Sequence, residues 1–158
     1  MSLWAKSLWD WALEAYARPG AAEVCLELQD RHGQSVPYLL WAAWAAQGGV
    51  TLTATELTAG AWLARAWDEA AVAPLRQVRR RLKTPMSGMP DAPREAARAQ
   101  VKAAELATEH ALMLALEAMT PAERGEARPL AQALTEASAA WGPETGPQAL
   151  GDLAQALA

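Results

Sequence analysis

One stretch of eleven residues limits the fold of this chain more than any other part of it. Residues 36–46 (VPYLLWAAWAA) contain no charged side chain and are followed by Gly48 and Gly49. Ser35 precedes the stretch as an N-cap, and Pro37 stands in the first helical turn, where proline is tolerated. A helix that is apolar on all sides has to be enclosed by other elements. The sequence therefore predicts a buried central helix over residues 36–46.

The composition predicts that the surrounding elements are helices as well. Of the 158 residues 39 are Ala, while the chain has no Phe, no Ile and only six Val. Ala favours helices, and the residues that favour strands are scarce. Because Ala buries little area, Leu, the five Met and the eight Trp have to fill the core. We expect an all-α, single-domain helical bundle of about five to six helices.

Capping residues and helix breakers predict two short helices before the central one. Ser7, with an acidic residue three positions later, caps a first helix over residues 8–17, which is apolar on two faces. Residues 18–20 (Arg-Pro-Gly) end it and open the next helix. The second helix spans about residues 21–31 and stops at Gly33.

Two long helices are predicted after the central one. Thr53 and Glu56 form a capping box for a helix over about residues 54–83, in which Pro74 predicts a kink near residues 70–73. A connector of turn-forming residues then leads to a helix over about residues 94–119. The side chains expected inward are Leu57, Ala61, Ala64, Trp67, Val72, Leu75, Val78 and Leu82 on the first, and Val101, Leu106, Leu112, Met113 and Leu116 on the second.

The last quarter of the chain carries weaker signals. Residues 120–123 (Thr-Pro-Ala-Glu) are a further capping signature, and short helices are predicted over residues 129–140 and 147–157. Because this part is rich in Ala, Gly and Pro, we expect a less ordered extension over residues 120–158 beside a bundle domain over residues 1–119.

The sequence also predicts a cytoplasmic, soluble protein. Cys25 is the only cysteine, which excludes an internal disulfide and suits a reducing compartment. Residues 1–6 lack the pattern of an export signal, and no apolar run reaches the ~20 residues of a membrane span. The net charge of −4 favours solubility.

Several segments of the chain resemble a known family. The likeness is carried by Leu8-Trp9-Asp10-Trp11-Ala12-Leu13, Tyr16-Ala17-Arg18-Pro19-Gly20, Cys25-Leu26, Leu28-Gln29, Gly33, Leu39-Leu40-Trp41 with Trp44, Ala73-Pro74-Leu75-Arg76, Arg79, Arg80 and Leu82. Over residues 3–118 this pattern is similar to an uncharacterised bacterial family, the domain of unknown function 2390. The resemblance implies a helical bundle of similar size and no established activity, and it leaves the tail without a counterpart.

The strongest polar feature is a basic run over residues 76–83 (RQVRRRLK). It holds five positive charges and no acid, so the rest of the chain carries −9. Helical spacing places Arg76, Arg79, Arg80 and Lys83 on one face. Such a run is usually the solvated basic end of a helix, where cations offset the helix dipole. The alternative is a docking face for an acidic or phosphate-bearing partner.

The tryptophans have two interpretations. In a chain without Phe they fill core volume. An exposed pair from Trp4 and either Trp9 or Trp11 would instead mark a protein contact or a surface for self-association.

No known pattern of metal or catalytic residues is present. Glu109 and His110 are adjacent and lack the Glu-x-x-His spacing of di-iron bundles. The chain has two His and no Gly-x-Ser-x-Gly turn. We therefore expect no metal site, no cofactor and no catalytic residue. A hidden enzyme would require a polar cluster around Asp10, Arg18 and Asp68.

The sequence leaves two hypotheses for function. The first is a non-catalytic interaction or regulatory module that binds a macromolecular partner through the basic helix end or an N-terminal Trp-rich surface. We expect that partner to be a protein, because the chain is acidic as a whole and has no nucleic-acid recognition motif; self-association stays open. The alternative is a bundle that binds a small apolar ligand between its first, third and fourth helices.

Overall fold

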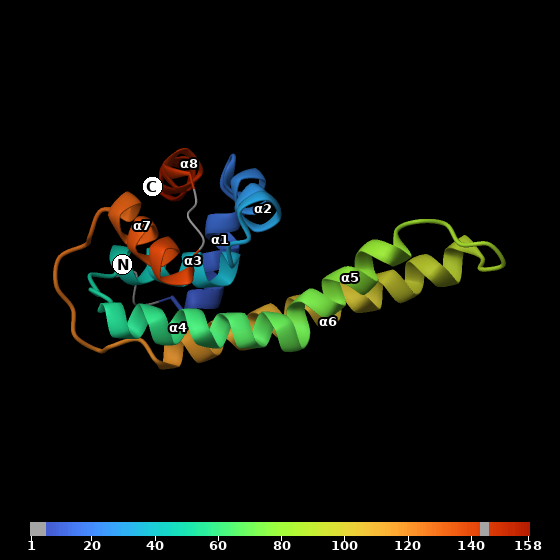
Figure 1. Ribbon diagram of the computed structural model, residues 1–158, viewed down its shortest axis with the longest axis horizontal. Coiled ribbons are helices and arrows are strands. Elements are labelled where there is room, and N and C mark those ends of the chain that lie inside the picture. The colour runs from blue at the N-terminus through green and yellow to red at the C-terminus, as the bar shows by residue number, and fades with distance from the viewer. Residues whose placement is uncertain (1–5, 143–145) are drawn as a thin grey trace.

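The protein is a bundle of helices from which a two-helix hairpin projects (Figure 1). The computed structural model describes residues 6–142 and 146–158, and every regular element in these ranges is helical, which confirms the all-α class. The helices are more numerous than expected. They are α1 (Leu8–Tyr16), α2 (Ala21–His32), α3 (Val36–Gln47), α4 (Ala54–Trp67), a π-helical segment (Asp68–Val72), α5 (Ala73–Leu82), α6 (Asp91–Ala118), α7 (Leu130–Trp141) and α8 (Pro147–Leu157).

Helix α3 is the centre of the bundle, as the sequence predicts. All its residues from 38 to 46 are buried, and α3 packs against α1, α2, α4, α6 and α7. The hydroxyl of Tyr38 lies 3.1 Å from the carbonyl oxygens of Leu57 and Ala137, which join α4 and α7 to α3. The indole of Trp41 donates to the hydroxyl of Thr120 at 2.8 Å. The polar side-chain atoms of Tyr38 and Trp41 therefore have partners on neighbouring elements.

Most of the described tryptophans fill core volume. Trp11, Trp41, Trp44 and Trp141 are buried. Trp62 is the exception, with 71% of its surface exposed. The large indole rings compensate for the small volume that the many alanines contribute.

The helix that starts at the Thr53–Glu56 capping box changes form where the proline predicts a kink. The backbone N–H of Ala73 donates to the carbonyl of Asp68, five residues earlier, so the chain makes one wide π turn there. Pro74 has no N–H to donate, and its ring would clash with the carbonyl four residues earlier in a regular α-helix. The wider turn makes room for the proline ring, and α5 then continues at an angle to α4 (Figure 1).

Helix α5 and the first half of α6 form the projecting hairpin. Arg94 is buried near its tip, where it donates to the carbonyl of Leu82 at 2.7 Å and pairs with Asp91 at 3.0 Å. Helix α6 begins at Asp91, three residues earlier than predicted. Two expectations about buried faces are wrong here, because Val78 is 43% and Leu106 is 50% exposed. A hairpin only two helices thick can cover one side of each helix and no more.

The C-terminal helices belong to the same core as the N-terminal ones. Both predicted short helices are present, as α7 and α8, and they pack on α3, α4 and α2. Leu134, Trp141 and Leu153 are buried in the core that surrounds α3. Residues 120–158 therefore pack more closely than their composition indicates, because their few Leu and Trp side chains all face inward.

The capping signature over residues 120–123 does not start a helix, so this expectation was wrong. The hydroxyl of Thr120 accepts from Trp41 and donates to the carbonyl of Leu116 at 2.9 Å. The hydroxyl is thus used to end α6 and to pair a buried indole. The following chain is irregular and is held by Gly125, whose N–H donates to the carbonyl of Gly49 at 2.7 Å.

The contact between Gly60 and Trp41 gives a test of this packing. A Cβ atom at Gly60 would lie 2.4 Å from the Cζ3 atom of Trp41, which is fully buried and cannot move aside. We expect Gly60→Ala to lower the free energy of unfolding by about 1–3 kcal/mol in urea denaturation followed by circular dichroism.

Gly151→Ala is the matched control. Gly151 lies inside α8, and a Cβ atom there meets nothing within 4 Å. This change should stabilise the protein by up to about 1 kcal/mol, because Ala has the higher helix propensity. Equal effects at the two positions would contradict the close packing of α4 on α3.

Candidate functional site

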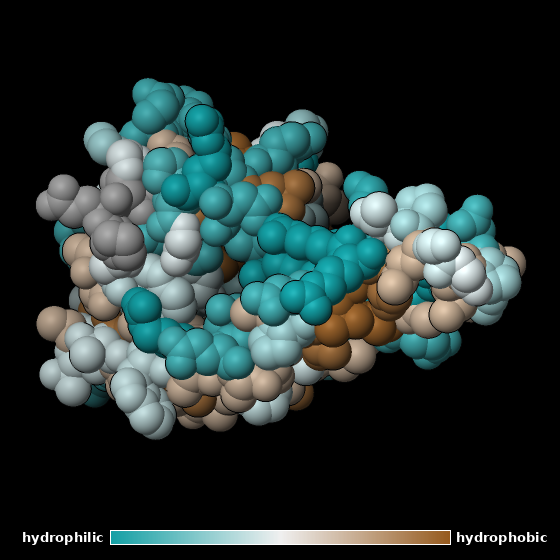
Figure 2. Space-filling model, turned by 45° about the vertical axis from the view of Figure 1, so that its right-hand side comes forward, coloured by the Kyte–Doolittle hydropathy of each residue, from teal (hydrophilic) through white to brown (hydrophobic). Residues whose placement is uncertain are grey.

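The projecting hairpin carries a charge opposite to that of the rest of the protein. Residues 73–108 contain eight basic and three acidic side chains, a balance of +5, so the remaining chain carries −9 of the total −4. Figure 2 shows hydrophilic residues gathered along one side of the hairpin, next to a hydrophobic strip. The basic run over residues 76–83 is thus part of a positively charged hairpin on an otherwise negatively charged protein.

The four residues of the predicted basic face do not all point the same way. Arg76 and Arg79 turn toward α6, where both meet Glu105. The Nε atom of Arg79 lies 2.5 Å from Glu105 Oε2, and the Nε atom of Arg76 lies 3.5 Å from Glu105 Oε1. The side chain of Glu105 is only 9% exposed. These two arginines therefore join α5 to α6 and do not share the exposed face that the helical spacing predicts.

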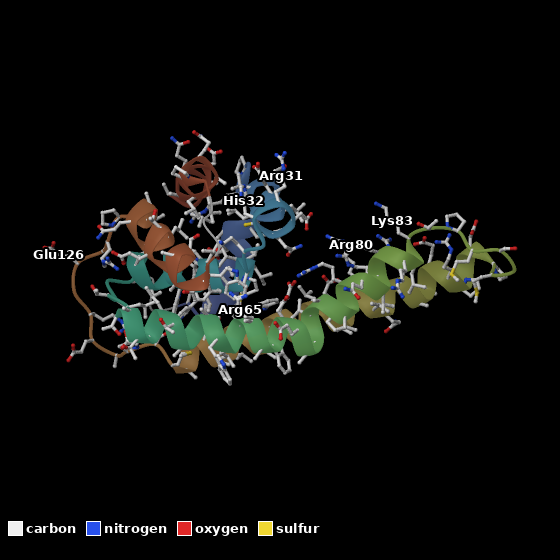
Figure 3. The ribbon with its side chains drawn as sticks, in the orientation of Figure 1. Arg31, His32, Arg65, Arg80, Lys83 and Glu126 are labelled. Carbon is white, nitrogen blue, oxygen red and sulfur yellow. The ribbon has the colours of Figure 1, made fainter. Side chains whose placement is uncertain are left out.

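Arg80 and Lys83 lie on the outer side of α5 (Figure 3). Arg80 pairs with Asp30 of α2 at 3.0 Å and so joins the hairpin to the bundle, while 55% of its side chain stays exposed. Lys83 and the neighbouring Arg81 are exposed, and no described residue forms an ion pair with either of them. The exposed cations of α5 without an ion pair among the described residues are therefore Arg81 and Lys83, which lie on different faces of the helix.

The junction between hairpin and bundle contains two carboxyl groups with altered pKa values. Burial, and next the nearby charge of Glu105, raise the pKa of Glu109 to about 7, against the opposing effect of Arg76 and Arg79. Burial also raises the pKa of Asp68, although Arg76 opposes this. Such shifts are frequent at functional sites, but ion-pair networks that only hold a structure produce them too.

Sequence reasoning did not identify Glu105 and Glu109 as members of this cluster. The signal that could have identified Glu105 is its position on the inward stripe of α6, since it lies seven residues before Leu112 and four after Val101. A carboxylate on an otherwise apolar stripe indicates a buried ionic partner.

The polar cluster suggested by Asp10, Arg18 and Asp68 does not form. Asp10 is exposed in the first turn of α1, where its backbone N–H donates to Ser7 Oγ at 3.1 Å. Arg18 donates to the carbonyl of Leu157 at the end of α8. Asp68 lies 4.0 Å from Arg76, at the junction with the hairpin. The three residues therefore have separate partners, in the cap of α1, at the end of α8 and on α5.

The N-terminal tryptophans do not form an exposed pair among the described residues. Trp11 is buried, and its indole donates to Gln47 at 3.1 Å. Trp9 is partly buried and stacks on His110 with the ring centroids 4.2 Å apart. Trp4 lies outside the described residues.

A polar pocket of about 120 Å³ lies beside the junction. Its walls come from the turn between α2 and α3, the π-helical segment, α5, α6 and the end of α7. The lining side chains that carry charge are Asp68 and Arg76, and Trp141 is also part of the lining. This is not the place, between the first, third and fourth helices, where the sequence suggested a ligand pocket.

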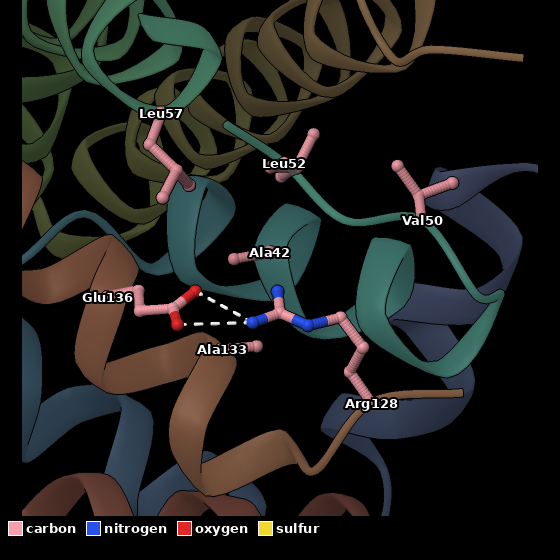
Figure 4. Close-up of a pocket in the computed structure, with 7 residues that line it drawn as sticks. All are labelled: Ala42, Val50, Leu52, Leu57, Arg128, Ala133 and Glu136. Carbon is pink, nitrogen blue, oxygen red and sulfur yellow. Dashed lines mark hydrogen bonds and ion pairs between the residues drawn. The ribbon is translucent and has the colours of Figure 1, made fainter. Parts of the chain in front are cut away.

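A second hollow, under α7, is much smaller. It has a volume of about 10 Å³, which is room for one water molecule. Figure 4 shows how the guanidinium of Arg128 crosses it to Glu136, at 3.1 and 3.0 Å from the two carboxylate oxygens. This ion pair closes the hollow and joins the irregular chain after α6 to α7.

Three further properties of the described residues concern metal ligands, membrane spans and the only cysteine. They contain no group of three or more His, Cys, Asp or Glu that could hold a metal ion. None of their helices is both long enough and apolar enough for a membrane span. Cys25 is a buried free thiol, and burial raises its pKa to about 12, so it is protonated at neutral pH.

These features define the protein as an α-helical bundle with a projecting, positively charged hairpin. The chain belongs to the family described as protein of unknown function DUF2390, whose family model matches residues 7–116. The match runs from α1 nearly to the end of α6 and includes the whole hairpin. Comparisons with curated proteins and with solved structures give no match.

The raised pKa of Glu109 predicts a pH dependence of stability. Because the folded protein holds this proton more tightly than the unfolded chain does, stability should fall as pH rises from about 4.5 to about 7. We expect Glu109→Gln to remove that loss and to stabilise the protein by about 3 kcal/mol at pH 8, with little change at pH 4.

Chemical denaturation at both pH values measures this difference. Glu126→Gln, in the exposed loop before α7 (Figure 3), is the control and should show no such pH dependence. A Glu109→Gln effect of equal size at pH 4 and pH 8 would mean that the carboxyl titrates normally in the folded protein.

Proposed function

We propose that this protein is a non-catalytic interaction module of the bacterial cytoplasm, which docks an acidic protein partner through the outer side of its hairpin. The observation that carries the proposal is the separation of charge, +5 on residues 73–108 against −9 on the rest. A positive strip on a negative molecule steers a complementary partner to one place and repels it from the others.

The shape of the hairpin supports this function. The hairpin extends away from the bundle, so a partner can reach α5 and α6 without meeting the acidic body (Figure 1). Arg81 and Lys83 are exposed and have no ion-pair partner among the described residues. Inward pairing of Arg76 and Arg79 with Glu105 keeps the hairpin in one conformation, which lowers the entropy lost on binding.

Apolar residues beside the basic strip favour a protein over a nucleic acid. Val78 and Leu106 on the two helices, and Met86 and Met89 at the tip, are between 43% and 55% exposed. Protein interfaces combine an apolar centre with a charged rim, whereas nucleic acids select long basic surfaces. The charge of −9 on the bundle would also repel an extended polyanion.

A photo-crosslinking amino acid at Gln77, on the exposed side of α5, tests where the partner binds. The same amino acid at Gln132, on the exposed side of α7, is the matched position on the bundle. We expect one acidic protein to be crosslinked in cells from position 77 and not from position 132, with identification by mass spectrometry.

Charge reversal with the purified pair then measures the contribution of the strip. Arg81→Glu with Lys83→Glu should weaken binding by at least about tenfold at low salt, because attraction becomes repulsion, and less at high salt. Arg31→Glu with Arg124→Glu changes the net charge equally on exposed residues of the bundle and should leave the affinity within about twofold.

Two results would reject the proposal. The first is equal loss of affinity in the two double variants, which would indicate an effect of net charge alone. The second is tight binding of the purified protein to duplex or single-stranded nucleic acid at physiological salt, lost in the Arg81→Glu/Lys83→Glu variant, because the strip would then recognise phosphates.

A further inference from the structure

We propose that the pocket at the junction of hairpin and bundle binds a small zwitterion of the α-amino acid class, with Arg76 receiving its carboxylate and Asp68 its ammonium group. This site is separate from the hairpin surface of the proposed function and does not depend on it.

The pocket is lined by both charged and apolar side chains. Asp68 and Arg76 line it from the π-helical segment and α5, while Val36, Val72 and Trp141 supply apolar wall. Its volume of about 120 Å³ is somewhat smaller than the 150 Å³ of a cavity that holds a benzene molecule. A ligand of roughly five to eight heavy atoms, with one small apolar group, matches this space.

Arg76 has binding capacity that the protein does not use. Only 16% of its side chain is exposed, yet its ion pairs with Glu105 and Asp68 are 3.5 and 4.0 Å long. Both distances exceed the 2.7–3.2 Å of an N–H···O hydrogen bond, and no described residue forms a closer one with this guanidinium. A guanidinium has five N–H donors in a planar arrangement that suits a carboxylate.

The neighbouring charges exclude simpler ligands. Asp68, together with Glu105 and Glu109 around the same guanidinium, repels a plain anion that approaches Arg76. Arg76 in turn repels a plain cation that approaches Asp68. A molecule with one negative and one positive group, as far apart as the two atoms of an ion pair, satisfies both side chains at once.

The apolar wall is held rigidly, which suits recognition of a defined side chain. The indole of Trp141 donates to the carbonyl of Gly33 at 2.7 Å. The guanidinium of Arg65 lies 4.3 Å above the same ring and also donates to the carbonyl of Trp141 at 2.6 Å. Asp68 and Val72, four residues apart in the π-helical segment, both line the pocket.

Titration of the full-length, ¹⁵N-labelled protein tests the site with defined probes. L-valine is the zwitterion, isovalerate lacks its ammonium group, and isobutylamine lacks its carboxylate. We expect L-valine, added up to ~10 mM, to shift the indole N–H signal of Trp141 and the amide signals of Gly33 and Gln34. The two singly charged probes should bind at least about tenfold more weakly.

Matched variants separate the two contacts. Arg76→Gln and Asp68→Asn should each weaken L-valine binding by at least about tenfold, whereas Arg81→Gln and Glu69→Gln, exposed neighbours outside the pocket, should change it by less than about twofold. Amide spectra of all four variants show whether the fold is kept. The Arg81→Glu/Lys83→Glu variant should bind L-valine normally, so failure of one proposal does not imply failure of the other.

The proposal is overturned if L-valine causes no shift at these residues. It is also overturned if isovalerate or isobutylamine binds as tightly as L-valine, or if Arg76→Gln keeps its fold and its full affinity.

Discussion

Enclosure of the uncharged helix α3 is the constraint on which the rest of the structure depends. Nine consecutive residues of this helix are buried, so neighbours are needed on all sides, and α1, α2, α4, α6 and α7 provide them. The polar atoms of Tyr38 and Trp41 find partners on α4, on α7 and after α6. The family match ends at residue 116, yet α7 completes this enclosure, so a helix beyond the matched residues is needed to cover α3.

The hairpin is stabilised differently from the bundle, because it extends beyond that core. With two helices and no third layer, it cannot bury a wide apolar face, and its inner contacts include Arg79 with Glu105 and Arg94 with the carbonyl of Leu82. The same thinness leaves Val78 and Leu106 exposed beside the basic residues. The π turn connects the bundle to the base of the hairpin. Asp68 and Arg76 lie at this edge of the bundle.

Short sequence patterns correctly predicted the features that are set by residues close together in the chain. The central helix, the Thr53 capping box, the change of form near Pro74 and the two short C-terminal helices all follow from short-range patterns. Two of the failures share one cause, which is a competing partner far away in the chain. Thr120 was expected to cap a helix but pairs with Trp41, 79 residues earlier, and Arg76 and Arg79 were expected to face solvent but turn toward Glu105.

The amino-acid sequence by itself determined the all-helical class, the burial of residues 38–46 and the membership in the DUF2390 family, because each depends on composition or on spacing along one helix. Only the tertiary structure decided which charges meet. Arg79 and Glu105 are 26 residues apart, and Arg80 and Asp30 are 50 apart, so helical periodicity cannot relate them. Their pairing, and the pocket beside it, result from how the hairpin leaves the bundle, which is set by packing between helices.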